Sequence, residues 1–150
     1  MLKILVDINV ILDVLLDRQP HVNASAAIRE AIETGTAEGY LAAHAITTLH
    51  YLISRGQTTA KTRRTLESLL RIFRIATADD AVIREALQSP ATDFEDAVSA
   101  ACARAAHCDL IVTRDPRGFR FSAVRALTPE AALPLLQPKA LQPKALQPEA

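Results

Sequence analysis

Four aspartates lie where predicted strands end or a predicted helix begins, and together they could do metal chemistry. Asp7 directly follows the apolar run 2–6, and Asp115 comes shortly after a second such run. Asp93 and Asp96 open an Ala-rich segment and are one helical turn apart, which puts them on one helix face. Crowded carboxylates repel one another unless a cation lies between them. Oxygen ligands with few competing His or Cys side chains favour Mg²⁺ or Mn²⁺.

Each of these positions also has a purely structural interpretation. Asp7 could cap the helix that follows it. Residues 92–95 have the spacing of a capping box with Thr92 as N-cap, in which case the nearby aspartates only favour the positive helix end. Asp115 precedes a proline, a common turn pair. The combination favours a site, because all of these positions fall at one predicted edge of the fold.

The apolar pattern predicts alternating strands and helices. Strands are expected at 2–6, 38–41, 73–76, 110–112 and 123–127. Helices are expected at 8–16, 22–34, 44–54, 58–70, 79–88, 94–106 and 128–136. This alternation predicts an α/β fold with a parallel sheet covered on both faces. Ligands of such sheets bind beyond the carboxyl ends of the strands.

The composition predicts one soluble domain followed by a tail. The chain has 150 residues, with 17 basic and 17 acidic side chains, so bulk charge does not attract nucleic acid or membrane. No apolar stretch approaches membrane-span length, and two cysteines without a metal motif fit a reducing cytoplasm. The folded domain is expected to cover 1–136. The repeated LQPKA sequence predicts a flexible tail over 137–150, because proline recurs every fifth residue.

Three segments resemble the signature blocks of PIN domains, in the family's order and spacing: LVDINVILD from Leu5, DFEDAV from Asp93 and IVTRD from Ile111. The likeness covers about residues 2–136 and is nearest to small prokaryotic VapC-type toxin ribonucleases. It implies a three-layer α/β/α domain with a central parallel sheet, which binds Mg²⁺ or Mn²⁺ and hydrolyses RNA phosphodiester bonds. It also implies a homodimer and a cognate antitoxin protein encoded beside the toxin.

The resemblance also assigns roles to residues. It makes Asp7, Asp96 and Asp115 catalytic metal ligands, with Asp93 an auxiliary ligand and Asn9 a support for Asp7. The second family acid, usually a Glu in the helix after the second strand, is replaced by Thr48. No Asp or Glu occurs between residues 38 and 67 to take its place.

Two functional hypotheses therefore stay open beside a weaker third. The first is a Mg²⁺- or Mn²⁺-dependent endoribonuclease, the toxin of a toxin–antitoxin pair. The second is a catalytically weakened PIN-like module that binds RNA or a protein partner, which the substitution at Thr48 favours. The third is a metal-dependent phosphotransfer enzyme or phosphatase at the same sheet edge.

Cationic residues near the aspartates are candidates for binding substrate phosphate. Arg114 and Arg117 flank Asp115, and Arg18 lies near the end of the first predicted helix. Thr113 could position a water or a phosphate. The segment 55–74 holds six basic residues and one acid, which suits either a phosphate backbone or a solvated helix face.

The third and fourth predicted helices carry more apolar residues than a small core needs. This surplus predicts a homodimer that uses part of their surface. The residues concerned are Leu49, Leu52, Ile53, Leu66, Leu69 and Leu70.

Overall fold

The short apolar runs pair into one parallel five-stranded sheet in the computed structural model, which describes residues 1–136. β1 (Lys3–Val6) is central, between β2 (Glu38–Ala42) and β4 (Leu110–Val112). β3 (Arg74–Ala76) and β5 (Arg125–Leu127) form the two edges, in the order β3-β2-β1-β4-β5. The predicted parallel sheet is confirmed, and its last strand begins two residues later than expected.

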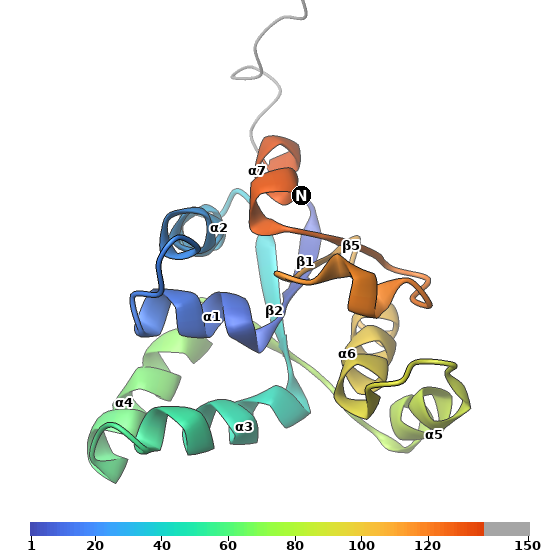
Figure 1. Ribbon diagram of the computed structural model, residues 1–150, viewed down its shortest axis with the longest axis horizontal. Helices are drawn as coiled ribbons and strands as arrows, with labels where there is room; N and C mark the ends of the chain where they lie inside the picture. Colours follow the sequence, from blue (N-terminus) through green and yellow to red (C-terminus); the bar gives the residue numbers. More distant parts are fainter. Residues whose placement is uncertain (137–150) are drawn as a thin grey trace, which may run out of the picture.

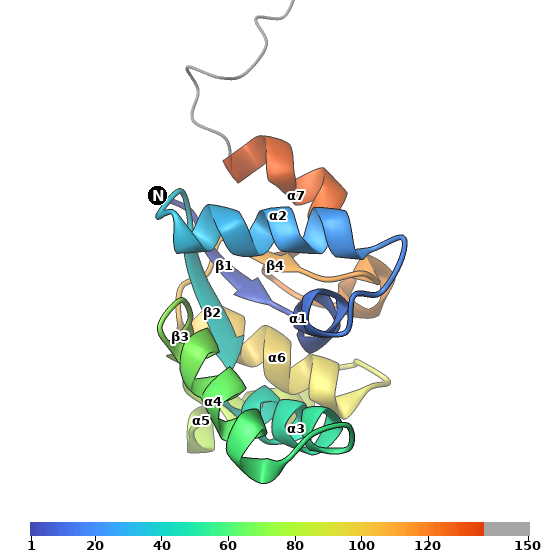
Figure 2. The same cartoon turned by 90° about the vertical axis from the view of Figure 1, so that its left-hand side faces the viewer.

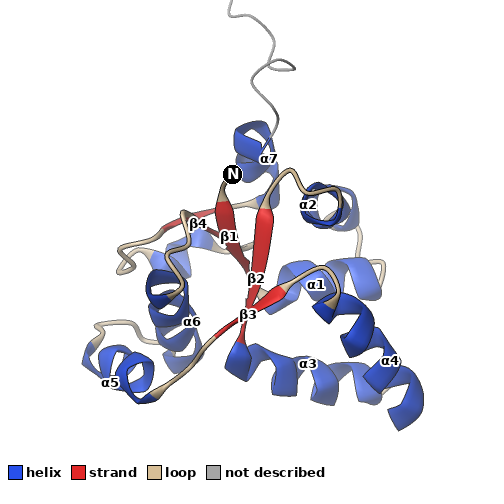
Figure 3. Cartoon of the chain, turned by 180° about the vertical axis from the view of Figure 1, so that it is seen from behind, coloured by secondary structure: helices blue, strands red, loops and turns tan. Residues whose placement is uncertain are grey.

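Helices cover both faces of the sheet, which confirms the three-layer α/β/α architecture (Figure 1, Figure 2). One face carries α1 (Ile8–Leu15), α2 (Val22–Glu33), α3 (Ala43–Ser54), α4 (Thr59–Leu70) and α7 (Pro129–Leu136). The other face carries α5 (Asp80–Gln88) and α6 (Phe94–Ala105). Figure 3 shows the two groups of helices from behind, on either side of the strands. Within residues 1–136, no helix is long and apolar enough to cross a membrane.

The central position of β1 explains why its sequence is continuously apolar. Ile4 and Val6 belong to the core under α1 and α2, whereas Leu5 belongs to the core under α6. All three side chains are buried, because alternate residues of a strand point to opposite faces and both faces are covered. The strand ends at Asp7, which therefore stands at the carboxyl edge of the sheet.

Two junctions bring helix starts to the same edge. α3 begins at Ala43, the residue after the end of β2, so its first turn lies beside that strand's carboxyl end. α6 packs flat on the other face of the sheet through small, buried residues that include Ala97, Ala100 and Ala101. Its Asp-rich first turn can therefore reach the edge where β1 and β4 end.

The N-cap expected for α6 is wrong by one residue. The cap is Asp93, whose Oδ1 accepts a hydrogen bond from the backbone N–H of Asp96 at 3.1 Å. An aspartate caps a helix as well as a threonine does, so the capping-box spacing from Thr92 did not decide between them. The cap also gives the Asp93 carboxylate a structural partner.

The predicted apolar surplus on α3 and α4 is smaller than the sequence indicated. Leu49, Ile53 and Leu69 are buried in the core between these helices and the sheet. Leu70 remains exposed, and Leu52 and Leu66 are partly buried. The homodimer stays a prediction, with less apolar surface behind it. The predicted tail, 137–150, lies outside the described residues.

Gly39 in β2 tests the packing of this core. A Cβ there would come within 2.8 Å of the Ile32 side chain and 2.9 Å of Phe73. We expect Gly39→Ala to lower the free energy of unfolding by about 1–3 kcal/mol through overpacking, measured by thermal melting. Gly56→Ala is the matched control, because no atom lies within 4 Å of its Cβ position. Equal melting temperatures for the two variants would contradict the close packing of α2 on β2.

Candidate functional site

Asp7 is held in place at the end of β1 by two hydrogen bonds. Its Oδ1 accepts from the backbone N–H of Ile8 at 2.8 Å, and its Oδ2 accepts from the Thr113 hydroxyl at 2.9 Å. Burial raises the pKa of the Asp7 carboxyl, and these hydrogen bonds and the charge of Arg114 only partly counteract it. The carboxylate is thus fixed in direction and incompletely solvated.

Thr113 connects the ends of the two central strands. The residue is buried, and its hydroxyl oxygen also accepts the backbone N–H of Asp115 at 3.3 Å. One hydroxyl therefore orients the Asp7 carboxylate and shapes the backbone that carries Asp115. The sequence left open a role for Thr113 toward water or phosphate, and the structure gives it contacts to protein.

Asp96 is the carboxyl whose environment is most perturbed. Burial, followed by the charges of Asp93, Asp7 and Asp115, raises its pKa from 3.8 to about 6. Gly118 lies against it, since a Cβ there would be 3.0 Å from Asp96 Oδ2. The turn η1 (Pro116–Phe119) thus brings the loop after β4 onto the first turn of α6. The four predicted aspartates therefore lie near one another at one edge of the sheet, close enough for their charges to act on Asp96.

These acids do not converge on one point as they stand. Asp115 Oδ1 lies 3.3 Å from the Arg117 guanidinium in an exposed ion pair, and Asp93 caps α6. Among residues 1–136, no group of three His, Cys, Asp or Glu side chains is arranged to hold a metal ion. The donor set still suits a hard divalent cation, because neighbouring carboxylates repel one another and positive charge between them stabilises the group.

Two residues near the acids were not predicted as site residues. His44, in the first turn of α3, places Nε2 3.5 Å from the Ser99 hydroxyl of α6. Burial lowers its pKa, while the charges of Glu95 and Asp7 raise it, so the ring lies close to both. Glu95 is exposed on α6, and its charge also raises the pKa of Asp96. The strand-end rule, applied to β2, could have identified His44.

Thr48 and Asn9, to which the resemblance also gives a place at the site, differ in their exposure and contacts. Thr48 is half-buried and lies one turn after His44, so both share one face of α3. Asn9 is exposed, and Asp7 takes its hydrogen bonds from Ile8 and Thr113 instead. A role for Asn9 toward Asp7 stays a prediction.

The predicted phosphate-binding arginines already have carboxylate partners. Arg114 Nε lies 3.1 Å from Oδ2 of Asp13, a buried residue of α1, and Arg117 pairs with Asp115. By contrast, four cations of α4 and its end have no ion pair among the described residues. They are Lys61, Arg63, Arg64 and Arg71. This exposed basic helix face suits either of the two interpretations given by the sequence.

Asp96→Asn tests whether the acids repel one another. Because the folded-state pKa is raised above the unfolded value of 3.8, the stability that Asp96 contributes is present below that pH and lost as pH rises through about 6. We expect the variant to melt higher than the parent at pH 8, by roughly 2–4 °C after solvent screening. The difference should vanish near pH 4. A lower melting temperature at pH 8 would instead mean that the charged Asp96 stabilises the start of α6 through the helix dipole.

Solved structures with this architecture come from several bacteria. FitAcB from Neisseria gonorrhoeae is 24% identical, with a TM-score of 0.62 over 85% of this chain and 98% of that one. VapBC from Salmonella typhimurium, solved bound to DNA, is 18% identical, with a TM-score of 0.64 over 86% and 99%. VapBC2 from Rickettsia felis, bound to a promoter DNA fragment, is 12% identical, with a TM-score of 0.67 over 85% and 98%.

These identities are low, so the solved structures show a shared fold only. No curated protein sequence matches the chain. The sequence profile of the PIN domain, however, matches residues 3–117, which span all three segments that carry the predicted site residues. The chain therefore belongs to the PIN domain family.

Proposed function

We propose that this protein is a Mg²⁺- or Mn²⁺-dependent endoribonuclease of PIN type. The observation that carries the proposal is the raised pKa of Asp96, about 6, which results from burial and from the charges of Asp93, Asp7 and Asp115 at the same edge of the sheet. Such a cluster costs stability unless positive charge compensates it. Family membership makes nuclease chemistry the reaction class that these groups serve best.

In this proposal, Asp7, Asp96 and Asp115 hold the cation, and Asp93 is auxiliary. A bound Mg²⁺ or Mn²⁺ supplies activation of water and neutralisation of charge on the phosphate. Thr113 keeps the Asp7 carboxylate in one orientation through its 2.9 Å hydrogen bond. The Arg117–Asp115 pair is exposed, hence weak, so Asp115 is available to the cation and Arg117 to substrate phosphate. Arg114 contacts phosphate on the other side of Asp115.

The neighbours also suggest a partner for the protein. The names VapBC and FitAcB each join the letters of two proteins that were solved together. The resemblance in the sequence is to VapC-type toxins. We therefore propose that the chain is the toxin of a toxin–antitoxin pair, bound by a cognate antitoxin protein in the cytoplasm. The homodimer belongs to the same proposal. A weakened module that binds RNA without cutting it is the second candidate, because Thr48 replaces the second family acid.

Removal of the Asp7 carboxylate should strongly reduce cleavage. We expect Asp7→Asn to lower Mn²⁺-dependent cleavage of a mixed RNA pool by about two orders of magnitude, the scale of a several-kcal/mol loss of charge stabilisation. Asp109→Asn is the matched control, since Asp109 Oδ2 accepts a hydrogen bond from the Lys3 backbone N–H at the amino end of β1, away from the acids. Calorimetric Mn²⁺ binding should fall in Asp7→Asn and not in the control. Equal cleavage by both variants would reject the assignment.

Restoring an acid on α3 separates the two candidate functions. We expect Thr48→Glu to tighten Mn²⁺ binding by about 1–3 kcal/mol, because it adds a charge one turn from His44. The control is Thr47→Glu, at an exposed position about 100° around the helix. Tighter binding with faster RNA cleavage would identify an attenuated nuclease, whereas tighter binding without cleavage would favour the binding module. Unchanged Mn²⁺ affinity would show that Thr48 does not face the acids.

A further inference from the structure

Asp13 is a charged side chain with no exposed surface, on the face of α1 that packs toward the core. A buried carboxylate is tolerated only with compensating partners. The Ser25 hydroxyl donates a hydrogen bond to its Oδ2 at 3.3 Å, and Arg114 Nε lies 3.1 Å from the same oxygen. Arg18 Nη1 lies 3.9 Å from Oδ1. Asp13 therefore holds two guanidinium groups that come from different parts of the chain.

The charges of this cluster do not cancel. Two guanidinium groups share the Asp13 carboxylate, so these three side chains together carry one net positive charge. Asp13 Oδ1 and Arg114 Nε make no hydrogen bond within the described structure, so the pairing is not geometrically saturated. The Arg18 and Arg114 side chains keep 38% and 30% of their surface exposed. Each guanidinium has five N–H donors, so donors remain for a ligand in solvent.

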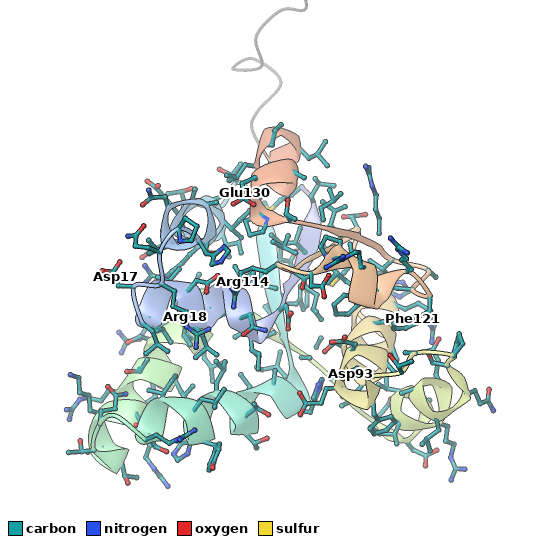
Figure 4. The ribbon with its side chains drawn as sticks, viewed as in Figure 1. Asp17, Arg18, Asp93, Arg114, Phe121 and Glu130 are labelled. Carbon is teal, nitrogen blue, oxygen red and sulfur yellow. The ribbon has the colours of Figure 1, made fainter. Side chains whose placement is uncertain are left out.

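The cluster of Asp13, Arg18 and Arg114 also lies beside the acidic edge, by which we mean the carboxyl edge of the sheet with Asp7, Asp96 and Asp115. Arg114 stands between Thr113 and Asp115 in the chain, and its charge lowers the pKa of Asp7. Figure 4 shows Arg114 next to α1 near the middle of the molecule, with Arg18 farther out toward the end of that helix. The two guanidinium groups thus lie along α1, with Arg18 at the helix end that also carries Asp17. A strand whose reacting phosphate is at the acids would place a neighbouring phosphate along this line.

We propose that Arg114 and Arg18, anchored by Asp13, form a subsite for a phosphate of the RNA strand next to the cleaved bond. This inference rests on the proposed function. Guanidinium groups bind phosphate with paired hydrogen bonds in a fixed plane. Because Asp13 already restricts both side chains, less side-chain entropy is lost when phosphate binds. The net charge of the cluster selects an anion.

The first test measures RNA binding without cleavage. Fluorescence anisotropy of a labelled single-stranded RNA of mixed sequence, in EDTA, would compare the parent with Arg18→Gln. This variant leaves the closer Arg114–Asp13 pair in place. We expect its affinity to fall about 3- to 30-fold, and the slope of log affinity against log salt to decrease by about 0.7, the value for one lost phosphate contact on a single strand. Arg29→Gln, in an exposed pair with Glu33 on α2, is the control and should change neither quantity.

Replacing Arg114 alone would take away the closer of the two cations that pair with the buried Asp13, so the second variant is the double change Asp13→Asn with Arg114→Gln. It removes the buried carboxylate and its closest cation together, and thermal melting checks its fold. We expect weaker RNA binding and a reduced salt slope here too. If Arg18→Gln binds RNA like Arg29→Gln, or if the folded double variant binds like the parent, the cluster is structural and the subsite is rejected. Failure of the parent to bind RNA in EDTA would also reject it.

These outcomes are separable from failure of the proposed nuclease. A parent protein that binds RNA through Arg18 and Arg114 in EDTA, yet never cleaves it with Mn²⁺, would support the subsite and reject the enzyme. Cleavage by the parent with unchanged affinity in both arginine variants would do the reverse.

Discussion

The hydrogen bond from the Thr113 hydroxyl to Asp7 joins the carboxyl ends of β1 and β4, and the geometry of the acidic edge depends on it. The parallel register already brings Val6 opposite Val112, so both chains leave the sheet side by side. The same hydroxyl accepts the N–H of Asp115, which limits how far the following loop can turn away. One buried threonine thus relates two aspartates more than a hundred residues apart in the chain.

The cost of this arrangement is electrostatic. Burial and the charges of Asp93, Asp7 and Asp115 raise the pKa of Asp96, so the ionised form of this side chain lowers the stability of the fold. Existing partners relieve part of it: Asp93 bonds the start of α6, and Asp115 faces Arg117. A bound cation would compensate the charge of Asp93 and Asp115 in place of these two contacts. Charged groups whose pKa is shifted at the expense of stability are typical of catalytic and binding sites.

Strand ends and the Ala-rich helix could be predicted from sequence, because both follow from local patterns. Parallel strands share a carboxyl edge, and this rule alone is enough to predict that Asp7 and Asp115 lie near each other. Asp13 escaped notice because its partners, Ser25 and Arg114, are distant in sequence and only tertiary packing joins them. The burial of Leu49 and Leu69 could not be predicted for a similar reason. The apolar side chains on one face of a helix do not reveal how much of that face the sheet covers. The N-cap of α6 depended on backbone angles at adjacent residues that are both good caps.

β1 has a further consequence for how the molecule opens. Its side chains contribute to the cores on both faces of the sheet, so neither helical layer can detach without exposing this strand to water. The two layers should therefore unfold as one cooperative unit, and the amide hydrogens of Ile4, Leu5 and Val6 should exchange with solvent only when the whole domain opens. Asp7 is attached to the end of this slowest-exchanging segment. Thermal fluctuations that loosen the helices at the surface would leave the first of the clustered acids in place.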